Sequence, residues 1–415
     1  MTKEQKAINY HIGGKVSLGL KRNITNQDDL SLAYTPGVAL PCLEIAKEKE
    51  KVYNLTSKCN TVAVVTDGTA VLGLGNIGPY ASIPVMEGKA CLFKKFGLVD
   101  AWPVPLQASY NSGKLDIDKF IDIVAALSPM YGGINLEDIA APACFEVEDR
   151  LEKMLDIPVF HDDQWGTGIV TVAGLINYCK LSNKNIKGLS VVINGAGAAG
   201  LRIYDMLKNE GIKDIYLADL EGVLTRDRDY SQNKMKGERA RETNKRTLQE
   251  AVRDADAIIM VSSYKRPDGK RTFDPRWVLE MKEFPAVFAM ANPIPEVSPE
   301  EVKKVMGQKD YIMATGRSDY PNQINNVLAF PYLFRGALDC RARDITLSMK
   351  TAAAHVLAEI IRERAPDEVN AICGGNNYQF DKDHIIPHPF DKRLIKAIPI
   401  AVTEAAIKDG VSREG

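Results

Sequence analysis

The chain lacks an excess of either charge. Its 415 residues include 53 Lys and Arg against 54 Asp and Glu, which gives a formal net charge of -1. A protein that binds nucleic acid or an anionic membrane through its overall field is strongly basic. The chain also has no apolar run near the ~18 residues of a membrane span, and its polar first ten residues do not resemble a secretory signal. We expect neither nucleic acid nor membrane as a partner.

Paired cysteines are also missing. The seven cysteines are odd in number, and none belongs to a Cys-x-x-Cys pair. This pattern is typical of a reducing compartment, and it argues against a disulfide framework or a cysteine zinc site. We therefore expect a cytoplasmic protein. At 415 residues the chain is too long for one ordinary core, so two or three domains are predicted.

Two predicted strands end in pairs of acidic residues. Residues 132–136 run into Glu137 and Asp138, and residues 157–160 are followed by Asp162 and Asp163. Consecutive parallel strands end on the same side of a sheet, so Glu137, Asp138 and Asp163 are expected to converge. A cluster of oxygen ligands suits Mg²⁺ or Mn²⁺. We predict a metal site there, with Asp163 on the seam between two α/β units.

A dinucleotide fingerprint follows this seam. An apolar strand at 189–194 leads into Gly195-Ala196-Gly197-Ala198-Ala199-Gly200, then a helix, then a strand that ends in Asp219. The glycines let the backbone approach a pyrophosphate at the helix N-terminus. Asp219 lies at the distance expected for a partner of the ribose 2′-hydroxyl group. Asn292 ends a later strand and should face the same crevice. We predict a bound NAD, with NADP as the alternative.

Other segments are less specific. Gly73, Gly75 and Gly78 share the spacing of the fingerprint, but the prolines that follow favour a turn where backbone approaches substrate. Tyr34 precedes a Pro-Gly turn, and its pattern alone indicates a tyrosine of the core. Lys89 lies on a predicted helix over 83–96, and its pattern alone indicates a solvated lysine. The amide-rich loop at 315–326 is compatible with a substrate role.

These segments, in this order, resemble bacterial short-form malic enzymes. The resemblance runs from about residue 30 to 340 and again over 386–393. It is carried by residues 31–38, 66–68, 71–75, 87–89, 135–138, 161–164, 195–199, 316–323 and 325–326.

The resemblance implies oxidative decarboxylation of L-malate to pyruvate and CO₂, and decarboxylation of oxaloacetate, with a nicotinamide coenzyme and a divalent metal. It implies that Tyr34 is the general acid and Lys89 the general base, with Asp162 in the proton network beside Lys89. The metal ligands would be Glu137, Asp138 and Asp163, as the strand ends already indicate. Asn325 and Asn326 would contact substrate. As a base Lys89 must act neutral, so we expect its pKa to be depressed.

The resemblance also implies the domain organisation. We expect a three-layer α/β malic domain over 1–160 and a Rossmann-type, doubly wound dinucleotide-binding domain over 161–385. A segment over 386–415 should pack back on the first domain. A homodimer is the default assembly.

The chain departs from the family at several positions. Ala70 replaces an arginine of the larger eukaryotic-type enzymes, which leaves one substrate carboxylate without an assigned partner. Glu221 would repel the 2′-phosphate of NADP and favours NAD, whereas Arg226 and Arg228 favour NADP. Trp165 stands where a smaller polar residue or His is usual.

Two other functions stay open at this stage. An amino-acid dehydrogenase also pairs a lysine-bearing domain with a Rossmann domain, but it needs no metal. A catalytically silent nucleotide-sensing protein would be expected to have lost Tyr34, Lys89 or the acidic residues, and the chain retains them.

Overall fold

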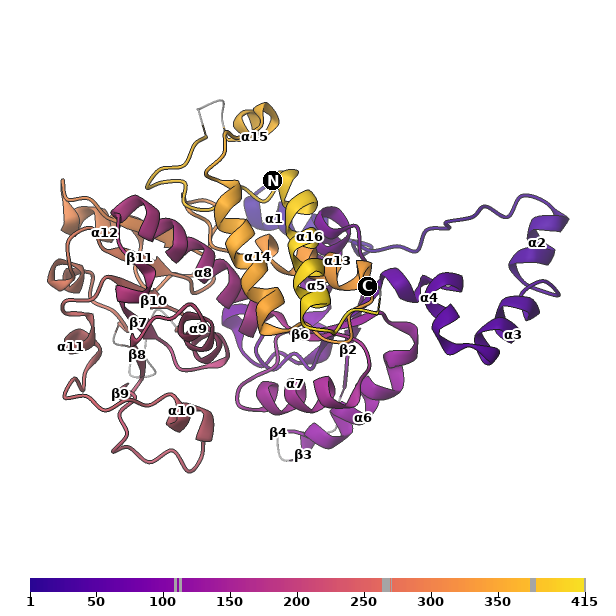
Figure 1. Cartoon of the computed structure of the whole chain (residues 1–415), viewed down its shortest axis with the longest axis horizontal. Coiled ribbons are helices and arrows are strands. Elements are labelled where there is room, and N and C mark those ends of the chain that lie inside the picture. Colours follow the sequence, from indigo (N-terminus) through magenta and orange to yellow (C-terminus); the bar gives the residue numbers. More distant parts are fainter. Residues whose placement is uncertain (108–109, 112–113, 263–268, 270, 374–377, 414–415) are drawn as a thin grey trace.

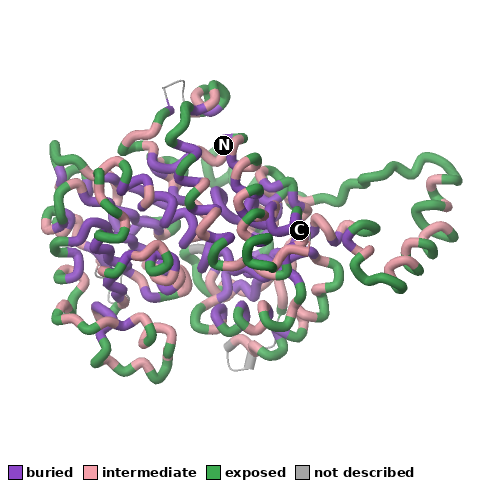
Figure 2. Tube along the Cα trace, viewed as in Figure 1, coloured by how far each residue is buried: buried purple, intermediate pink, exposed green. Residues whose placement is uncertain are grey.

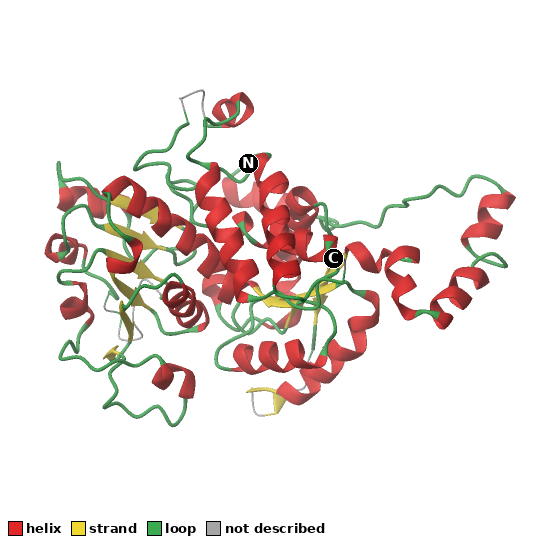
Figure 3. Cartoon of the chain, viewed as in Figure 1, coloured by secondary structure: helices red, strands yellow, loops and turns green. Residues whose placement is uncertain are grey.

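Two β-sheets, one parallel and one mainly parallel, make up the body of the molecule, and helices cover each of them (Figures 1 and 3). The computed structural model describes the chain except for residues 108–109, 112–113, 263–268, 270, 374–377 and 414–415. This architecture confirms the predicted α/β class with a Rossmann-type second unit.

The first sheet has the strand order β2-β1-β5-β6, and all of its strands are parallel. Its strands are β1 (Thr61–Thr66), β2 (Asp100–Pro105), β5 (Gly133–Leu136) and β6 (Val159–His161), and its helices are α5 (Gly78–Gly97), α6 (Ile117–Leu127) and α7 (Ala143–Met154). Figure 1 shows α6 and α7 on one side of the sheet and α5 on the other. Leu136 pairs with His161, so the acidic pairs that follow these two residues begin at the same level.

One long helix, α8 (Asp162–Ser182), starts at this edge and runs buried between the two units. It packs against α9 (Ala198–Asn209) and against α14 (Leu347–Ile360). Its apolar character on nearly all sides explains its place at the centre, because a helix without a polar face must be covered all round. The predicted seam at Asp163 is therefore the place where the two sheets are joined.

The second sheet has the order β12-β11-β10-β7-β8-β9, and only β9 runs antiparallel among these strands. Its elements are β7 (Ser190–Asn194), β8 (Asp214–Asp219), β9 (Gly222–Val223), α10 (Lys234–Glu238), α11 (Leu248–Val252), β10 (Ala257–Met260), β11 (Ala286–Ala289), α12 (Pro299–Met306) and β12 (Ile312–Thr315). The strand order reverses between β7 and β10, because β8 and β9 extend the sheet on one side of β7 and β10, β11 and β12 extend it on the other. Ligands of doubly wound sheets bind at such a switch point.

The chain returns to the first unit at α13 (Phe330–Asp339), earlier than residue 386. The helices that follow are α14, α15 (Asp367–Ile372) and α16 (Arg393–Lys408). Helix α13 packs on α5 so closely that a Cβ atom at Gly97 would lie 2.4 Å from the carbonyl oxygen of Pro331. Helix α16 packs on α13 and α14. The domain boundaries at 160 and 385 stay predictions.

An N-terminal arm, residues 20–47, projects from the body (Figures 1 and 2). It carries α2 (Gln27–Ala33) and α3 (Ala39–Lys47); α1 (Lys3–Tyr10) precedes it and α4 (Val52–Leu55) follows it. Several of its large apolar side chains are exposed, namely Leu20, Ile24, Leu30, Leu32, Tyr34, Leu40 and Leu43. Within the described part of the chain, no helix combines the length and the hydropathy that crossing a membrane requires.

Candidate active site

Three carboxylates meet at the ends of β5 and β6. Glu137, Asp138 and Asp163 each offer an oxygen atom, and these atoms lie within 4.8 Å of one another. Asp138 has a φ of 54°, a left-handed conformation that is uncommon for aspartate, and its backbone N–H donates to Asp163 Oδ2 at 2.8 Å. The structure thus brings together the predicted metal ligands. Glu137 and Asp138 are buried and Asp163 is partly exposed. A set of hard oxygen donors of this kind fits Mg²⁺ or Mn²⁺.

Lys89 lies beside this cluster and is buried, not solvated as its helical pattern indicated. Its Nζ atom donates to Glu137 Oε1 at 2.9 Å and to Asp162 Oδ2. The ammonium group also lies 4.0 Å from the ring centre of Phe330, at the start of α13. Helix α5 therefore directs Lys89 away from solvent and into contact with the ends of both strands.

The prediction of a depressed pKa for Lys89 is wrong for this arrangement. Burial alone would lower the pKa of Lys89, but the carboxylates of Asp162 and Glu137 raise it above its ordinary value. Burial also raises the pKa of Glu137, and neighbouring Asp163 adds to this effect against the opposing charge of Lys89. One ammonium group thus faces several carboxylates. This excess of negative charge is what a bound divalent cation would balance.

Asp162 is fixed from two sides. Asn326 donates from Nδ2 to Asp162 Oδ2 at 2.9 Å and to its carbonyl oxygen at 3.2 Å. Thr167 in turn donates to Asn326 Oδ1 at 3.2 Å. One helical turn beyond Asp162, a Cβ atom at Gly166 would lie 2.0 Å from Asp162 Oδ1. Only glycine leaves room for the carboxylate to reach Lys89.

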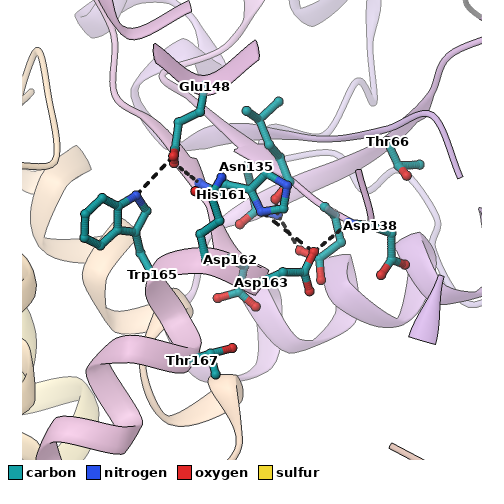
Figure 4. A network of polar contacts seen from close by, with 12 residues as sticks. Thr66, Asn135, Asp138, Glu148, His161, Asp162, Asp163, Trp165 and Thr167 are labelled. Carbon is teal, nitrogen blue, oxygen red and sulfur yellow. Dashed lines mark hydrogen bonds and ion pairs between the residues drawn. The ribbon is translucent and has the colours of Figure 1, made fainter. Parts of the chain in front are cut away.

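A second polar network lies behind the carboxylates (Figure 4). Glu148 accepts the backbone N–H of His161 at 2.8 Å and the indole N–H of Trp165 at 3.2 Å. Two cations lie over the ring of Trp165, Arg202 at 4.5 Å and Lys350 at 3.8 Å from its centre. The unusual Trp165 therefore ties the start of α8 to α7, α9 and α14.

Sequence reasoning missed Glu148, although a signal for it exists. Cys144, Val147 and Leu151 form the apolar face of α7, and Glu148 lies on the same face. A carboxylate on an apolar face must find buried donors. His161, one of its partners, is itself fully buried, and burial lowers its pKa to about 4, so its ring is neutral near pH 7. His161 Nδ1 lies 3.7 Å from Asp163 Oδ2.

A cavity of about 1160 Å³ joins the carboxylate cluster to the switch point of the second sheet. Predicted site residues that line it are Lys89, Glu137, Asp138, Asp162, Asp163, Ala198, Ala199, Asn292, Asn325 and Asn326. Gly73 also lines it, and a Cβ atom there would lie 2.6 Å from the carbonyl oxygen of Asn292. Gly73 is therefore a place of close approach between two backbone segments at the cavity wall, and an approach of this turn to substrate stays a prediction.

Each glycine of the dinucleotide fingerprint is required at its position for a different structural reason. Gly195 has a φ of 124°, and a Cβ atom there would lie 2.7 Å from the Val261 carbonyl oxygen. A Cβ atom at Gly200 would lie 1.7 Å from the carbonyl oxygen of Gly195. No described atom lies within 4 Å of a Cβ atom built at Gly197, so this glycine leaves space that a pyrophosphate can use. Gly195, Ala196 and Gly197 form the loop that enters α9, beside the cavity wall.

Glu296 is a further residue that the sequence did not single out. It is fully buried, and its two oxygens accept the backbone N–H groups of Ser262 at 2.7 Å and Ala291 at 3.1 Å. Burial raises its pKa to about 7. Because Ser262 and Ala291 line the cavity, Glu296 holds together two strand ends that face the coenzyme crevice.

Asp219 ends β8, as predicted, but its carboxylate already has partners. Arg228 and Lys236 donate to Asp219 Oδ2 at 3.0 Å and 2.8 Å. Arg228 also pairs with Glu221 at 3.0 Å. Burial opposes ionisation of Asp219, but the bonds from Arg228 and Lys236 lower its pKa. The predicted ribose partner thus belongs to a group of two acids and two bases.

Tyr34 lies apart from the other predicted catalytic residues. It follows α2 on the N-terminal arm, is 69% exposed, and does not line the cavity. Within one copy of the chain, the structure does not bring Tyr34 to Lys89.

A dinucleotide-type sheet beside a buried lysine and a carboxylate cluster defines a class of two-unit α/β proteins with a ligand cavity at the seam. Residues 14–152 match the family model described as "Malic enzyme, N-terminal domain", and residues 165–372 match "Malic enzyme, NAD binding domain". The chain belongs to the malic enzyme family.

Named relatives agree with this assignment. The chain is 48% identical over 419 residues to the "Bifunctional malic/malolactic enzyme" of Bacillus subtilis, covering 100% of this chain and 95% of that protein. It is 49% identical to the "Probable NADP-dependent malic enzyme" of Rickettsia prowazekii, covering 98% of this chain and 52% of that protein. It thus spans about half the length of that relative and of the similar Rhizobium meliloti protein. The malic enzyme structure from Pyrococcus horikoshii shares 44% identity and a TM-score of 0.87, covering 100% of this chain and 93% of that chain.

Proposed function

We propose that the protein oxidatively decarboxylates L-malate to pyruvate and CO₂, reduces NAD or NADP, and uses Mg²⁺ or Mn²⁺; it would also decarboxylate oxaloacetate. The observation that carries the proposal is the cavity in which Lys89 and the three carboxylates face the coenzyme loop. An amino-acid dehydrogenase would not use the carboxylate cluster, and a silent sensor would not need a buried lysine. Family membership favours neither alternative.

The chemistry follows from residues at the seam. A divalent cation held by Glu137, Asp138 and Asp163 would polarise the substrate hydroxyl group and stabilise the enolate charge after CO₂ leaves. Lys89 donates a hydrogen bond to Asp162. Transfer of the proton of this bond to Asp162 leaves a neutral amine, which can take the hydroxyl proton as hydride leaves C2 for the nicotinamide. Asp162 thus acts as the proton partner of Lys89.

The test is coenzyme reduction with L-malate, followed with Mn²⁺, with Mg²⁺ and after chelation. We expect turnover that falls at least about 100-fold on chelation and returns when metal is added, because the cation stabilises the developing charge. Turnover that is independent of metal, or none with malate under any of these conditions, would refute the proposal.

We propose NAD as the better coenzyme. The argument is the local charge: Arg228 is held by Asp219 and Glu221, and Lys236 by Asp219. A 2′-phosphate would meet both carboxylates before it gained a free cation, whereas a ribose hydroxyl group can donate to Asp219. The same assay with NADP tests this preference.

We further propose a cytoplasmic homodimer in which the N-terminal arm of one copy reaches the cavity of the other. Seven cysteines without a disulfide support the reducing compartment. The exposed apolar side chains of the arm support an interface, and a second copy is the commonest partner of a soluble enzyme. Tyr34 would then protonate C3 of the enolate in the partner's cavity, which accounts for its exposure on the arm.

Mixing two inactive variants tests this assembly. Tyr34→Phe and Lys89→Arg are each expected to be nearly inactive alone. After exchange of subunits, half of the dimers are mixed and one of their two sites has both residues, so activity should return to about a quarter of wild type. No recovery despite proven exchange would mean that Tyr34 and Lys89 act within one copy. Light scattering gives the mass of the assembly. Wild-type protein taken through the same exchange procedure alone controls for activity lost during that procedure.

A further inference from the structure

Besides Lys89, one other lysine lines the cavity. Among its described lining residues, the basic side chains are His11, Lys15 and Lys89. Lys89 is engaged by Asp162 and Glu137. Lys15 therefore gives the cavity a cation that is not paired with Glu137, Asp138 or Asp163.

Lys15 is held firmly against α5. Its backbone N–H donates to Glu87 Oε2 at 3.1 Å, and its carbonyl oxygen accepts from Cys91 Sγ at 3.6 Å. Its Nζ atom donates to the carbonyl oxygen of Pro84 at 2.7 Å. Both ends of the residue are thus tied to the helix that carries Lys89.

The position of the ammonium group also suits a ligand. Nζ of Lys15 lies 2.9 Å from His11 Nε2 in addition to its bond to Pro84. A lysine ammonium has three donors, so these two contacts leave one for a ligand. A Cβ atom at Gly88 would lie 3.4 Å from this Nζ. Glycine at position 88, directly before Lys89, therefore leaves this ammonium group uncrowded.

The charge of the proposed substrate requires a cation in the cavity. Malate carries two carboxylates, and one of them lies remote from the reacting hydroxyl group. The cavity already contains the carboxylates of Glu137, Asp138, Asp162 and Asp163, so an unpaired substrate carboxylate would be repelled. Ala70, which also lines the cavity, has no charge to offer.

We infer that Lys15 binds the carboxylate of malate that is remote from the hydroxyl group. This inference rests on the proposed function and names the partner that Ala70 cannot supply. The remote carboxylate leaves as CO₂ and loses its charge in that step. This charge is unchanged during the earlier hydride transfer. A cation beside it therefore stabilises bound malate and the hydride-transfer transition state alike, so Lys15 should affect KM and not kcat.

The test compares Lys15→Met with Lys15→Arg and with a matched control, Lys21→Met. Lys21 belongs to the same N-terminal segment and pairs with Asp100 at the surface. We expect Lys15→Met to raise KM for malate about 10- to 100-fold, the usual range for loss of a charge-assisted hydrogen bond, with kcat within about threefold. Lys15→Arg should recover most of the lost affinity, since it restores the positive charge, and Lys21→Met should equal wild type.

Oxalate inhibition separates carboxylate binding from a loss of structure. Oxalate presents both carboxylates to one metal ion and has no remote carboxylate, so its inhibition constant should not change in Lys15→Met. An unchanged KM for malate, or an equal weakening of oxalate and malate, would overturn the inference. Wild type that fails to oxidise malate would instead refute the proposed function, so the two failures are distinguishable.

Discussion

Lys89→Arg should lower kcat for malate oxidation by about 10²- to 10⁴-fold, the range that general acid–base catalysis contributes, and leave the fold intact. Arginine keeps the positive charge that Asp162 and Glu137 require, but it cannot release a proton near pH 7. The variant thus separates ion pairing from proton transfer. Steady-state kinetics measured beside a thermal unfolding scan would show a loss of turnover without a comparable loss of stability.

A matched control lies on the same helix. Lys94 is exposed and pairs with Asp100 at 2.6 Å, so Lys94→Arg should keep full activity. Lys89→Ala is a second variant for the same experiment. It leaves two buried carboxylates without their cation, which lowers the free energy of unfolding by on the order of 3–5 kcal/mol. A small primary amine in the buffer should restore part of its activity. Wild-type turnover in Lys89→Arg would exclude Lys89 as the base.

The acidic cluster could be predicted from sequence because local rules determine it. Parallel strands end at one edge, and the pairing of Leu136 with His161 sets both acidic pairs at one level. The fingerprint from Gly195 to Gly200 is equally local, since a strand, a tight turn and a helix follow one another. These features need only neighbouring residues and a parallel sheet.

The burial of Lys89 could not be predicted in this way. It depends on Phe330, far along the chain, which packs over the ammonium group once α13 has returned to α5. The same holds for Asp219, whose partners Arg228 and Lys236 lie 9 and 17 residues further along the chain. Ion pairs between distant segments leave no periodic signal in the sequence. Their effect on a pKa, as at Lys89, therefore becomes visible only in three dimensions.

Gly166→Ala is expected to have the other large effect, although it adds one methyl group. In an ordinary helix this change would stabilise by about 1 kcal/mol. Here the new Cβ atom would lie 2.0 Å from Asp162 Oδ1 and 2.9 Å from its Cγ. Asp162 must then turn away, and its bonds to Lys89 and Asn326 are lost. We expect kcat to fall about 100-fold or more, as for other displacements near 1 Å in an active site.

Gly168→Ala is the control, because it crowds the same helix two residues later without touching Asp162. Its Cβ atom would lie 2.6 Å from Met206 Sδ, and a methionine side chain can move, so a cost of about 1–3 kcal/mol in stability with near-normal kcat is expected. If both variants lost activity equally, packing of α8 and not the position of Asp162 would be the cause. The pH profile gives an independent check. Since Asp162 raises the pKa of Lys89, its displacement lowers that pKa, and the acidic limb of the profile should move to lower pH in Gly166→Ala alone.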